Sequence, residues 1–497
     1  MSTGSESAPR SAAAAARLTE AQQRAVAELL HLSPVIDALG ERFASAGEAI
    51  ALVGGSVRDA LLGRLGDDLD FTTSATPERV LELVAGWADA VWEVGIAFGT
   101  VGISKDDYRL EITTYRSESY DRASRKPEVT YGDSLEADLV RRDFTVNAMA
   151  VALPGRTFVD PYGGLVDLAS GVLRTPATPE ESFSDDPLRM MRAARLASQL
   201  GFDVAPEVVA AMAAMAERID IVSAERVQAE LVKLVCGLYP REGLALLVES
   251  GLAAHVLPEL PLLKLEIDEH HRHKDVYEHT LIVLEQAIDL EDGPNGDVPG
   301  PDFVLRFAAL MHDVGKPRTR RFESGGGVSF HHHEVVGAKL TRKRMQALKF
   351  SKELTDDVSQ LVELHLRFHG YGNGEWTDSA VRRYVRDAGP LLSRLHKLPR
   401  ADCTTRNQRR AALLKATYDS LEERIERLAE EEGRAALRPS LDGTQIMAIL
   451  SVPPGRIVGR AYAFLMELRL DRGPLGTDVA EAELRAWWAE QPESREP

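Results

Sequence analysis

The spacing of apolar residues changes part-way along the chain. Between Ala49 and about Thr175, short apolar runs alternate with polar turn residues, as in IALVGG, FGTVGIS and YRLEITTY. Such runs are typical of β-strands bounded by turns. After Asp185, apolar residues recur at three- and four-residue intervals, as in PLRMMRAARLASQLGF and ERVQAELVKLVCGL. This spacing predicts amphipathic helices, so a strand-containing part precedes an almost entirely helical one.

The length of the chain predicts several domains, because 497 residues exceed what one hydrophobic core normally serves. Turn-forming residues interrupt the helical part at EDGPNGDVPGPD and at the glycine run Gly325–Gly327. We predict an α+β protein with a mixed-sheet head and a helical remainder. In chain order its parts are an N-terminal tail and helix (1–45), the head (46–175), a helical neck (176–265), a His-rich helical domain (266–405) and a helical tail (406–497).

Composition narrows the class of protein. Hydrophobic residues make up 44% and charged residues 27%, as in ordinary soluble proteins. Cys236 and Cys403 are the two cysteines, which is too few for a disulfide framework and fits a reducing compartment. The N-terminus does not have the pattern of a secretory signal, and no apolar run is long enough to span a membrane. These features predict a soluble cytoplasmic protein without a membrane partner.

The net charge of -18 argues against a protein that coats nucleic acid nonspecifically, because phosphate binding needs a basic surface. Charge can nevertheless be segregated, and one stretch is locally basic: Lys339, Arg342, Lys343, Arg344, Lys349 and Lys352. An RNA-binding surface and a solvated helix face both fit that stretch.

The first candidate for chemistry is the segment AIALVGGSVRDALLG. It reads as a buried strand, a tight turn at Gly54 and Gly55, and a helix carrying Arg58. Glycines let backbone N–H groups approach phosphate oxygens, and a helix N-terminus favours negative charge. By itself the pattern also fits an ordinary turn.

The second candidate is the pair Asp68 and Asp70 in DLDF. In a strand, residues two apart share a face, so both carboxylates point the same way. They repel one another unless a cation neutralises them, and Mg²⁺ prefers oxygen ligands. Two such ions could bind both the attacking and leaving oxygens of a phosphoryl transfer. A solvated turn is the alternative. Glu111 in LEITTY is either a third carboxylate from a neighbouring strand or an exposed edge residue.

Two further segments carry arginines beside carboxylates. Arg142 and Asp143 stand in RRDFTVNA, a set that suits a triphosphate and a ribose hydroxyl or, alternatively, a helix cap. Asp186 and Arg189 flank Pro187, which opens a helix, and lie three residues apart on one face. An intrahelical salt bridge is the simple interpretation.

An Asp–Arg pair can also distinguish bases. Cytosine and adenine each present an amino donor beside a ring acceptor, which complements a carboxylate next to a guanidinium. Guanine and uracil reverse this order, leaving polar groups unpaired at a cost of roughly 1 to 3 kcal/mol each. Asp186 and Arg189 could therefore select C and A without a nucleic-acid template. Arg192 and Arg195 continue at three-residue steps toward a triphosphate or ribose.

The ordered segments GGSVRDALLG, DDLDFTT, VGIAFGTV, RRDFTVNAMA, DPYGGLVDL, DDPLRMMRAARLASQLGF and ERVQAEL resemble successive motifs of the bacterial-type (class II) CCA-adding tRNA nucleotidyltransferases. The resemblance covers about residues 50 to 235 and implies a nucleotidyltransferase head that adds C, C and A to tRNA from CTP and ATP. It implies catalysis with Mg²⁺ at Asp68 and Asp70, and nucleotide binding by Gly54, Gly55, Arg58, Arg142, Asp143, Asp186, Arg189, Arg192 and Arg195.

Two details qualify this resemblance. Asp185 stands where the family usually has Glu, and the shorter side chain could alter orientation or rate. Residues 116–133 resemble the flexible loop that the family needs to add the final A, which favours full CCA addition over CC addition.

The helical part contains histidines and aspartates that cannot ligate a metal locally and must converge from separate helices. DVYEHT, LMHDVGK, HHHEVVGA, LVELHL and RADCTTRN resemble the HD phosphohydrolase superfamily. This implies a divalent transition metal that activates water against phosphate esters, such as cyclic or terminal phosphates on tRNA ends. A domain that keeps its ligands without turnover is the alternative. The candidate ligands are His279, His312, Asp313, His333, His365 and Asp402.

Three other functions are compatible with parts of the sequence. A bacterial poly(A) polymerase shares the head and neck chemistry, although VWEVGIAFGTV resembles the CCA branch. A phosphohydrolase with an RNA-binding head is the second. A small-molecule nucleotidyltransferase is disfavoured, because its acceptor would not need so long a helical neck and tail. The sequence does not predict the oligomeric state.

Overall fold

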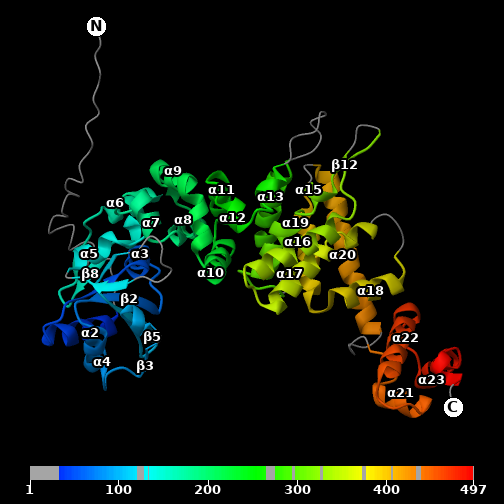
Figure 1. Ribbon diagram of the computed structural model, residues 1–497. Helices are drawn as coiled ribbons and strands as arrows, with labels where there is room; N and C mark the ends of the chain where they lie inside the picture. The colour runs from blue at the N-terminus through cyan, green and yellow to red at the C-terminus, as the bar shows by residue number, and fades with distance from the viewer. Residues whose placement is uncertain are drawn as a thin grey trace, which may run out of the picture. The chain divides into compact units, whose positions relative to one another are not determined.

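The computed structural model describes residues 33–93, 95–119, 128–132, 134–264, 275–293, 297–324, 328–371, 376–404, 407–431 and 438–495. The chain divides into two compact units after Pro258. In Figure 1 the first unit contains the sheet and a set of helices, and the second is built from helices and one short hairpin. The predicted α+β organisation is confirmed. Within the described ranges, no helix combines the length and apolarity that crossing a bilayer requires.

A seven-stranded mixed sheet forms the core of the first unit. Its strand order is β3-β4-β5-β2-β1-β8-β9, in which β2 and β5 run parallel and the other neighbours run antiparallel. The strands are β1 (Ile50–Val53), β2 (Asp68–Thr73), β3 (Ala90–Trp92), β4 (Thr100–Lys105), β5 (Tyr108–Thr114), β8 (Ala150–Leu153) and β9 (Thr157–Val159).

Alternation along the strands separates a buried face from an open one. Leu69 and Phe71 of β2 are buried, whereas Asp68 and Asp70, which alternate with them, are solvent-accessible. The same alternation holds in β5, where Leu110 and Ile112 are buried and Arg109 and Glu111 are exposed. Two helices, α2 (Pro34–Ser45) and α4 (Pro77–Val84), pack against the sheet. The carboxylates therefore stand on the open face because of strand periodicity alone.

The loop segment predicted at 116–133 lies partly outside the described residues. Its two ends form an antiparallel hairpin of β6 (Arg116–Ser119) and β7 (Glu128–Tyr131).

Helices continue the first unit beyond the sheet. Their breaks follow proline and capping signals: Thr178 and Glu181 form a capping box at the start of α7, and Pro187 precedes α8. Asp185 ends α7, so the two aspartates precede α8 rather than occupy its first turn. The helices are α3 (Gly55–Leu61), α5 (Leu135–Val140), α6 (Gly164–Ser170), α7 (Pro179–Asp185), α8 (Leu188–Leu200), α9 (Pro206–Met215), α10 (Ala224–Val235), α11 (Pro240–Glu249) and α12 (Ala253–Val256).

The described residues of the second unit form helices and one antiparallel strand pair, β12 (Arg321–Phe322) and β13 (Val328–Ser329). Its last three helices share an apolar core that includes Ile446, Leu465 and Leu484. The helices are α13 (Val276–Asp289), α14 (Phe303–Met311), α15 (Lys316–Thr319), α16 (His333–Ala347), α17 (Lys352–Leu364), α18 (Asp378–Ala388), α19 (Leu392–Asp402), α20 (Gln408–Glu431), α21 (Gly443–Leu450), α22 (Arg456–Arg472) and α23 (Thr477–Ala489).

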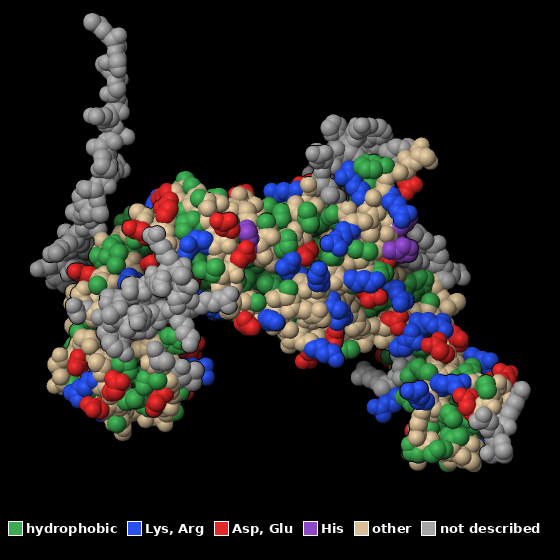
Figure 2. Space-filling model, in the orientation of Figure 1, with side chains coloured by type: hydrophobic (Ala, Val, Ile, Leu, Met, Phe, Trp, Pro, Cys, Tyr) green, Lys and Arg blue, Asp and Glu red, His purple; other side chains and the backbone are tan. Residues whose placement is uncertain are grey.

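Lys and Arg side chains are scattered over the visible face of the second unit, with acidic side chains among them (Figure 2). Within the predicted basic stretch, Arg342 pairs with Asp356, and Arg344 pairs with Glu259 at 2.9 Å. These partners neutralise part of the stretch, which supports its interpretation as a solvated helix face.

Candidate functional site

Strand pairing brings three carboxylates together on the open face of the sheet. The parallel register of β2 and β5 places Glu111 beside Asp70 and Arg109 beside Asp68. The backbone N–H of Asp70 donates to Ser56 Oγ at 2.9 Å, which ties β2 to the start of α3. Glu111 therefore lies on the strand next to the aspartates, which is the first of the two alternatives that the sequence allowed.

The electrostatics of this cluster fit a bound cation. Burial raises the pKa of Asp70, and Asp68 raises it further against the opposing effect of Arg142. Burial raises the pKa of Glu111 too, with Asp70 and Asp68 adding to the shift. Three oxygen-donor groups that repel one another form a donor set suited to Mg²⁺.

The glycine turn lies next to these carboxylates. Gly54 has φ +71°, a conformation that side chains disfavour, and a Cβ there would lie 2.8 Å from Arg142 Nη1. Gly54 and Gly55 line a cavity of about 480 Å³ together with Asp70 and Arg142. Glycine at position 54 thus avoids backbone strain at this positive φ and leaves Arg142 in its place beside the cavity.

Arg58 lies behind the turn rather than among the residues that line the cavity. Its guanidinium is bidentate to Asp59 at 3.0 and 2.8 Å, and its Nη1 donates to Asn147 Oδ1 at 2.6 Å. Nucleotide binding by Arg58 stays a prediction. In this conformation its contacts brace the turn.

Asp143 holds Arg192 at the cavity wall. Asp143 accepts hydrogen bonds from the Phe144 N–H at 2.8 Å and from Asn147 Nδ2 at 3.0 Å, and pairs with Arg192 Nη2 at 2.8 Å. Burial alone would raise the pKa of Asp143, but Arg192 and these hydrogen bonds lower it. Asp143 is therefore an ionised carboxylate that orients a cavity arginine.

Asp186 and Arg189 both line the same cavity but have separate partners. Asp186 accepts from the Leu188 N–H at 3.1 Å and pairs with Arg226 Nη2 at 2.8 Å. Arg189 donates to Ser182 Oγ at 2.9 Å and to the carbonyl oxygen of Arg141. The carboxylate thus pairs with Arg226 of α10, not with Arg189 in an intrahelical bridge.

Arg141, the first arginine of RRDFTVNA, lines the cavity as well, whereas sequence reasoning missed the cavity arginine Arg226. The signal for Arg226 was present, since it stands in the ERVQAEL segment. Arg195, by contrast, lies outside the cavity lining: it pairs with Glu230 at 2.5 Å and donates to Gln199 at 2.8 Å. Arg195 therefore connects α8 to α10.

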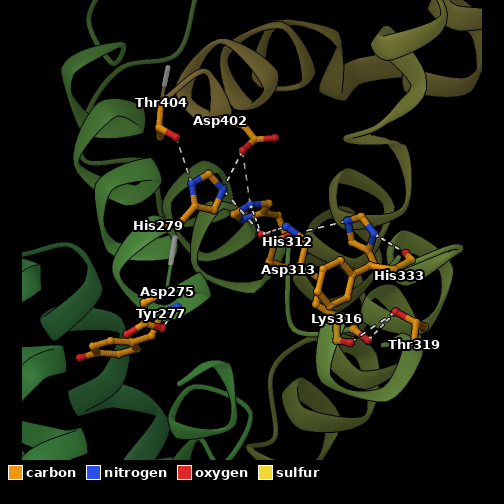
Figure 3. A network of polar contacts seen from close by, with 12 residues as sticks. Asp275, Tyr277, His279, His312, Asp313, Lys316, Thr319, His333, Asp402 and Thr404 are labelled. Carbon is orange, nitrogen blue, oxygen red and sulfur yellow. Dashed lines mark hydrogen bonds and ion pairs between the residues drawn. The ribbon is translucent and has the colours of Figure 1, made fainter. Parts of the chain in front are cut away.

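A second candidate site lies in the second unit. The six predicted ligands come from five helices and their ends, with His312 and Asp313 adjacent after α14. The labelled side chains of His279, His312, Asp313, His333 and Asp402 point toward one another in Figure 3. They form two groups, within each of which the possible ligand atoms lie within 4.8 Å of one another. The groups are His279, His312 and Asp402, and Asp313, His333 and His365.

Three of these imidazoles are oriented by backbone carbonyls. The Nδ1 atoms of His312, His333 and His365 lie 2.8, 2.9 and 2.6 Å from the carbonyl oxygens of residues 309, 330 and 362. Their Nε2 atoms are buried and have no hydrogen-bond partner among the described residues. Such orphaned acceptors are what a metal ion would satisfy.

Carboxylates complete both groups. Asp402 Oδ1 lies 2.9 Å from His279 Nε2, whereas Asp313 directs Oδ1 at His333 and Oδ2 at His312, at 3.3 and 3.2 Å. Asp313 therefore stands between the groups. Sequence reasoning missed Lys316, whose Nζ lies 2.5 Å from Asp313 Oδ2.

Three segments of the chain match known families. Residues 50–174 match the poly A polymerase head domain, and residues 201–263 match a domain described as the probable RNA and SrmB-binding site of polymerase A. Residues 276–431 match the HD domain.

Similar proteins support the same assignment. The chain is 34% identical over 461 residues to an A-adding tRNA nucleotidyltransferase of Deinococcus radiodurans, covering 89% of this chain and 96% of the relative. It is 45% identical over 208 residues to a CCA-adding enzyme of Levilactobacillus brevis, covering 42% of this chain and 51% of that relative. Its fold is similar to that of the Bacillus stearothermophilus CCA-adding enzyme in complex with CTP, with a TM-score of 0.64 and 24% identity. The match covers 92% of this chain and 98% of that structure's chain.

Proposed function

The chain belongs to the tRNA nucleotidyltransferase family, and we propose that it adds C, C and A in turn to the 3′ end of tRNA, using CTP and ATP and releasing pyrophosphate. One observation carries the proposal. A single cavity is lined by the glycine turn, the catalytic carboxylate Asp70, and the Asp186 and Arg189 side chains.

Triphosphate binding follows from the charge of that cavity. Backbone N–H groups at Gly54 and Gly55 open α3 and present donors to phosphate oxygens. Arg142 and Arg192 add guanidinium groups on the same wall. Together they place the α-phosphate near Asp70.

Asp68 and Asp70, with Glu111 beside them, would hold Mg²⁺. The bound ions supply charge neutralisation of the α-phosphate and a lower barrier for attack by the tRNA 3′-hydroxyl. The protein contributes the fixed direction of the carboxylates, because strand pairing and the Ser56 hydrogen bond orient β2.

Base selection follows from hydrogen-bond complementarity. The Asp186 carboxylate accepts from the amino group of C or A, and Arg189 donates to the neighbouring ring nitrogen. Arg226 pairs with Asp186, and Ser182 accepts a hydrogen bond from Arg189, so each side chain is held by a neighbour. Uracil and guanine would face these groups with the opposite donor order.

The test uses a tRNA that ends at the discriminator base, with each labelled nucleoside triphosphate and Mg²⁺. Two C residues and one A, lost in Asp68→Ala, are expected. Synthesis of long A tails would instead support the alternative that the protein is a poly(A) polymerase.

A second candidate, addition of the terminal A alone, is favoured by the full-length similarity to an A-adding enzyme. A tRNA that ends at the discriminator base separates the two, because a CCA-adding enzyme extends it with CTP and an A-adding enzyme does not. Both activities extend a tRNA that already ends in CC with A, which makes that tRNA the positive control.

For the second unit, we propose a metal-dependent phosphohydrolase acting on phosphate esters at tRNA ends, in the cytoplasm where its tRNA substrate is found. Orphaned Nε2 atoms support a transition metal there, and six ligands in two groups are enough for two ions. A bound ion supplies activation of water. Hydrolysis of a 2′,3′-cyclic phosphate at an RNA end to the phosphomonoester, lost in His312→Ala, tests it.

A further inference from the structure

A second cavity adjoins the catalytic carboxylates on the open face of the sheet. It has a volume of about 470 Å³ and is lined by Asp68, Leu69, Asp70, Trp92, Arg109 and Glu111. Asp70 lines both this cavity and the nucleotide cavity. The catalytic carboxylate thus stands at the border between two spaces of similar size.

Strand register explains why these side chains share one face. Asp70 is paired with Glu111, Glu111 with Gly102, and Gly102 with Trp92, so four neighbouring strands contribute one continuous row. Directly paired residues point to the same side of a sheet. The row therefore leads from the carboxylates to an indole at the edge strand β3.

Gly102 determines where the indole lies. A Cβ built on Gly102 would lie 1.9 Å from Trp92 Nε1, so the ring occupies the space that a side chain on β4 would fill. The ring is half-buried and lies over β4, two strand spacings or roughly 10 Å from β2. One nucleotide with its 3′-hydroxyl at Asp70 would span that distance.

We infer that this second cavity receives the 3′-terminal nucleotide of the tRNA acceptor, with its base stacked on Trp92 and its phosphate at Arg109. The inference rests on the proposed nucleotidyl transfer. In that reaction the attacking and leaving oxygens stand in line on opposite sides of the phosphorus. With the triphosphate in the arginine-rich cavity, the acceptor approaches the shared carboxylate from the other side.

The chemistry of the lining fits an acceptor better than a second nucleoside triphosphate. Among the described residues, Arg109 is the one cation that lines this cavity, and its side chain is exposed, which suits one phosphodiester. The nucleotide cavity is lined by five described arginines. The terminal base of the acceptor changes with each addition, from the discriminator to C and again to C. Stacking on an indole tolerates any base, because every base has a π-face.

The first experiment measures steady-state incorporation while tRNA and CTP are varied separately. Trp92→Ala should raise KM for tRNA roughly tenfold or more and leave KM for CTP unchanged, and Trp92→Phe should restore most of the affinity. Arg109→Gln should raise KM for tRNA and flatten its dependence on salt. Trp87→Ala, which removes a half-buried indole elsewhere in the head, is the matched control.

The second experiment does not depend on turnover. An acceptor RNA with 2-aminopurine as its terminal base should lose fluorescence on binding the wild type and the Trp92→Phe variant, but not a folded Trp92→Ala variant. Equal quenching by Trp92→Ala, or an unchanged KM for tRNA, overturns the subsite while the proposed function stands. Quenching that depends on Trp92, without incorporation by the wild type, overturns the proposed function and keeps the subsite.

Discussion

Asp143 and Arg192 form an ion pair of 2.8 Å that joins the segment before β8 to helix α8. The carboxylate is almost fully buried, whereas the guanidinium is partly exposed at the nucleotide cavity. An almost fully buried carboxylate therefore orients an arginine that lines the cavity.

Substitution of Asp143 should affect folding and nucleotide binding together. Asp143→Asn removes the charge opposite Arg192, so we expect a loss of about 2 kcal/mol in the free energy of unfolding and a higher KM for CTP. Urea denaturation and steady-state kinetics measure both. Asp167→Asn is the control, because buried Asp167 pairs with Arg174 outside the cavity and should lower stability without changing KM.

The same carboxylate predicts a pH dependence of stability. Because the pKa of Asp143 is lowered in the folded protein, its ionised form stabilises the fold above its unfolded pKa of about 4. That stabilisation is lost as the pH falls through the folded pKa. When denaturation is measured at a series of acidic pH values, the free energy of unfolding should fall less with decreasing pH in Asp143→Asn than in the wild type. The same pH dependence of stability in both proteins would contradict the assignment.

Substitution of Gly54 can distinguish the effect of backbone strain from that of a steric clash with Arg142. Gly54→Ala imposes a side chain at φ +71° and a clash with Arg142, so we expect a loss of roughly 1 to 2 kcal/mol in stability and a raised KM for both CTP and ATP. Gly63→Ala is a matched control, since Gly63 has φ +70° and open space around its Cβ position. It should share the strain and keep nucleotide binding. Equal KM values for the two variants would show that Arg142 simply moves aside.

Asp186 should govern discrimination between bases. We expect Asp186→Ala to reduce the preference for CTP over UTP by roughly 10- to 100-fold, since one unpaired polar group costs about 1 to 3 kcal/mol. The ratio of kcat/KM values for the two nucleotides measures it. Arg226→Ala should weaken discrimination less, because it removes only the partner that orients the carboxylate. Arg174→Ala, whose partners lie outside the cavity, is the control, and an unchanged ratio in Asp186→Ala would refute templating by this side chain.

The two proposed activities should be separable by mutation. His312→Ala removes one of the oriented Nε2 atoms, so it should lower the amount of bound transition metal and abolish hydrolysis of a 2′,3′-cyclic phosphate to its monoester, while CCA addition continues. Elemental analysis and the two activity assays test this. His331→Ala, at an exposed histidine just before α16, should change neither. Full metal content in His312→Ala would place the ion elsewhere.

Local spacing in the sequence determined a large part of this picture. The change from strand-like to helical periodicity predicted the α+β organisation, because side-chain direction repeats with the period of each element. The common face of Asp68 and Asp70, the turn at Gly54 and the helix after Pro187 follow from the same short-range rules. Each depends on neighbours only a few residues away.

Tertiary structure decided which partners these residues meet. Glu111 reaches Asp70 only through the parallel pairing of β2 with β5, and Trp92 reaches the same row only through the strand order at the sheet edge. Asp186 pairs with Arg226, 40 residues away, rather than with its helical neighbour Arg189. Arg58 and Arg195 do not line the cavity and pair instead with Asp59 and Glu230. Periodicity specifies the face of a helix or strand on which a side chain stands. The residues that lie opposite that face depend on packing between distant segments, and no local sequence pattern predicts this packing.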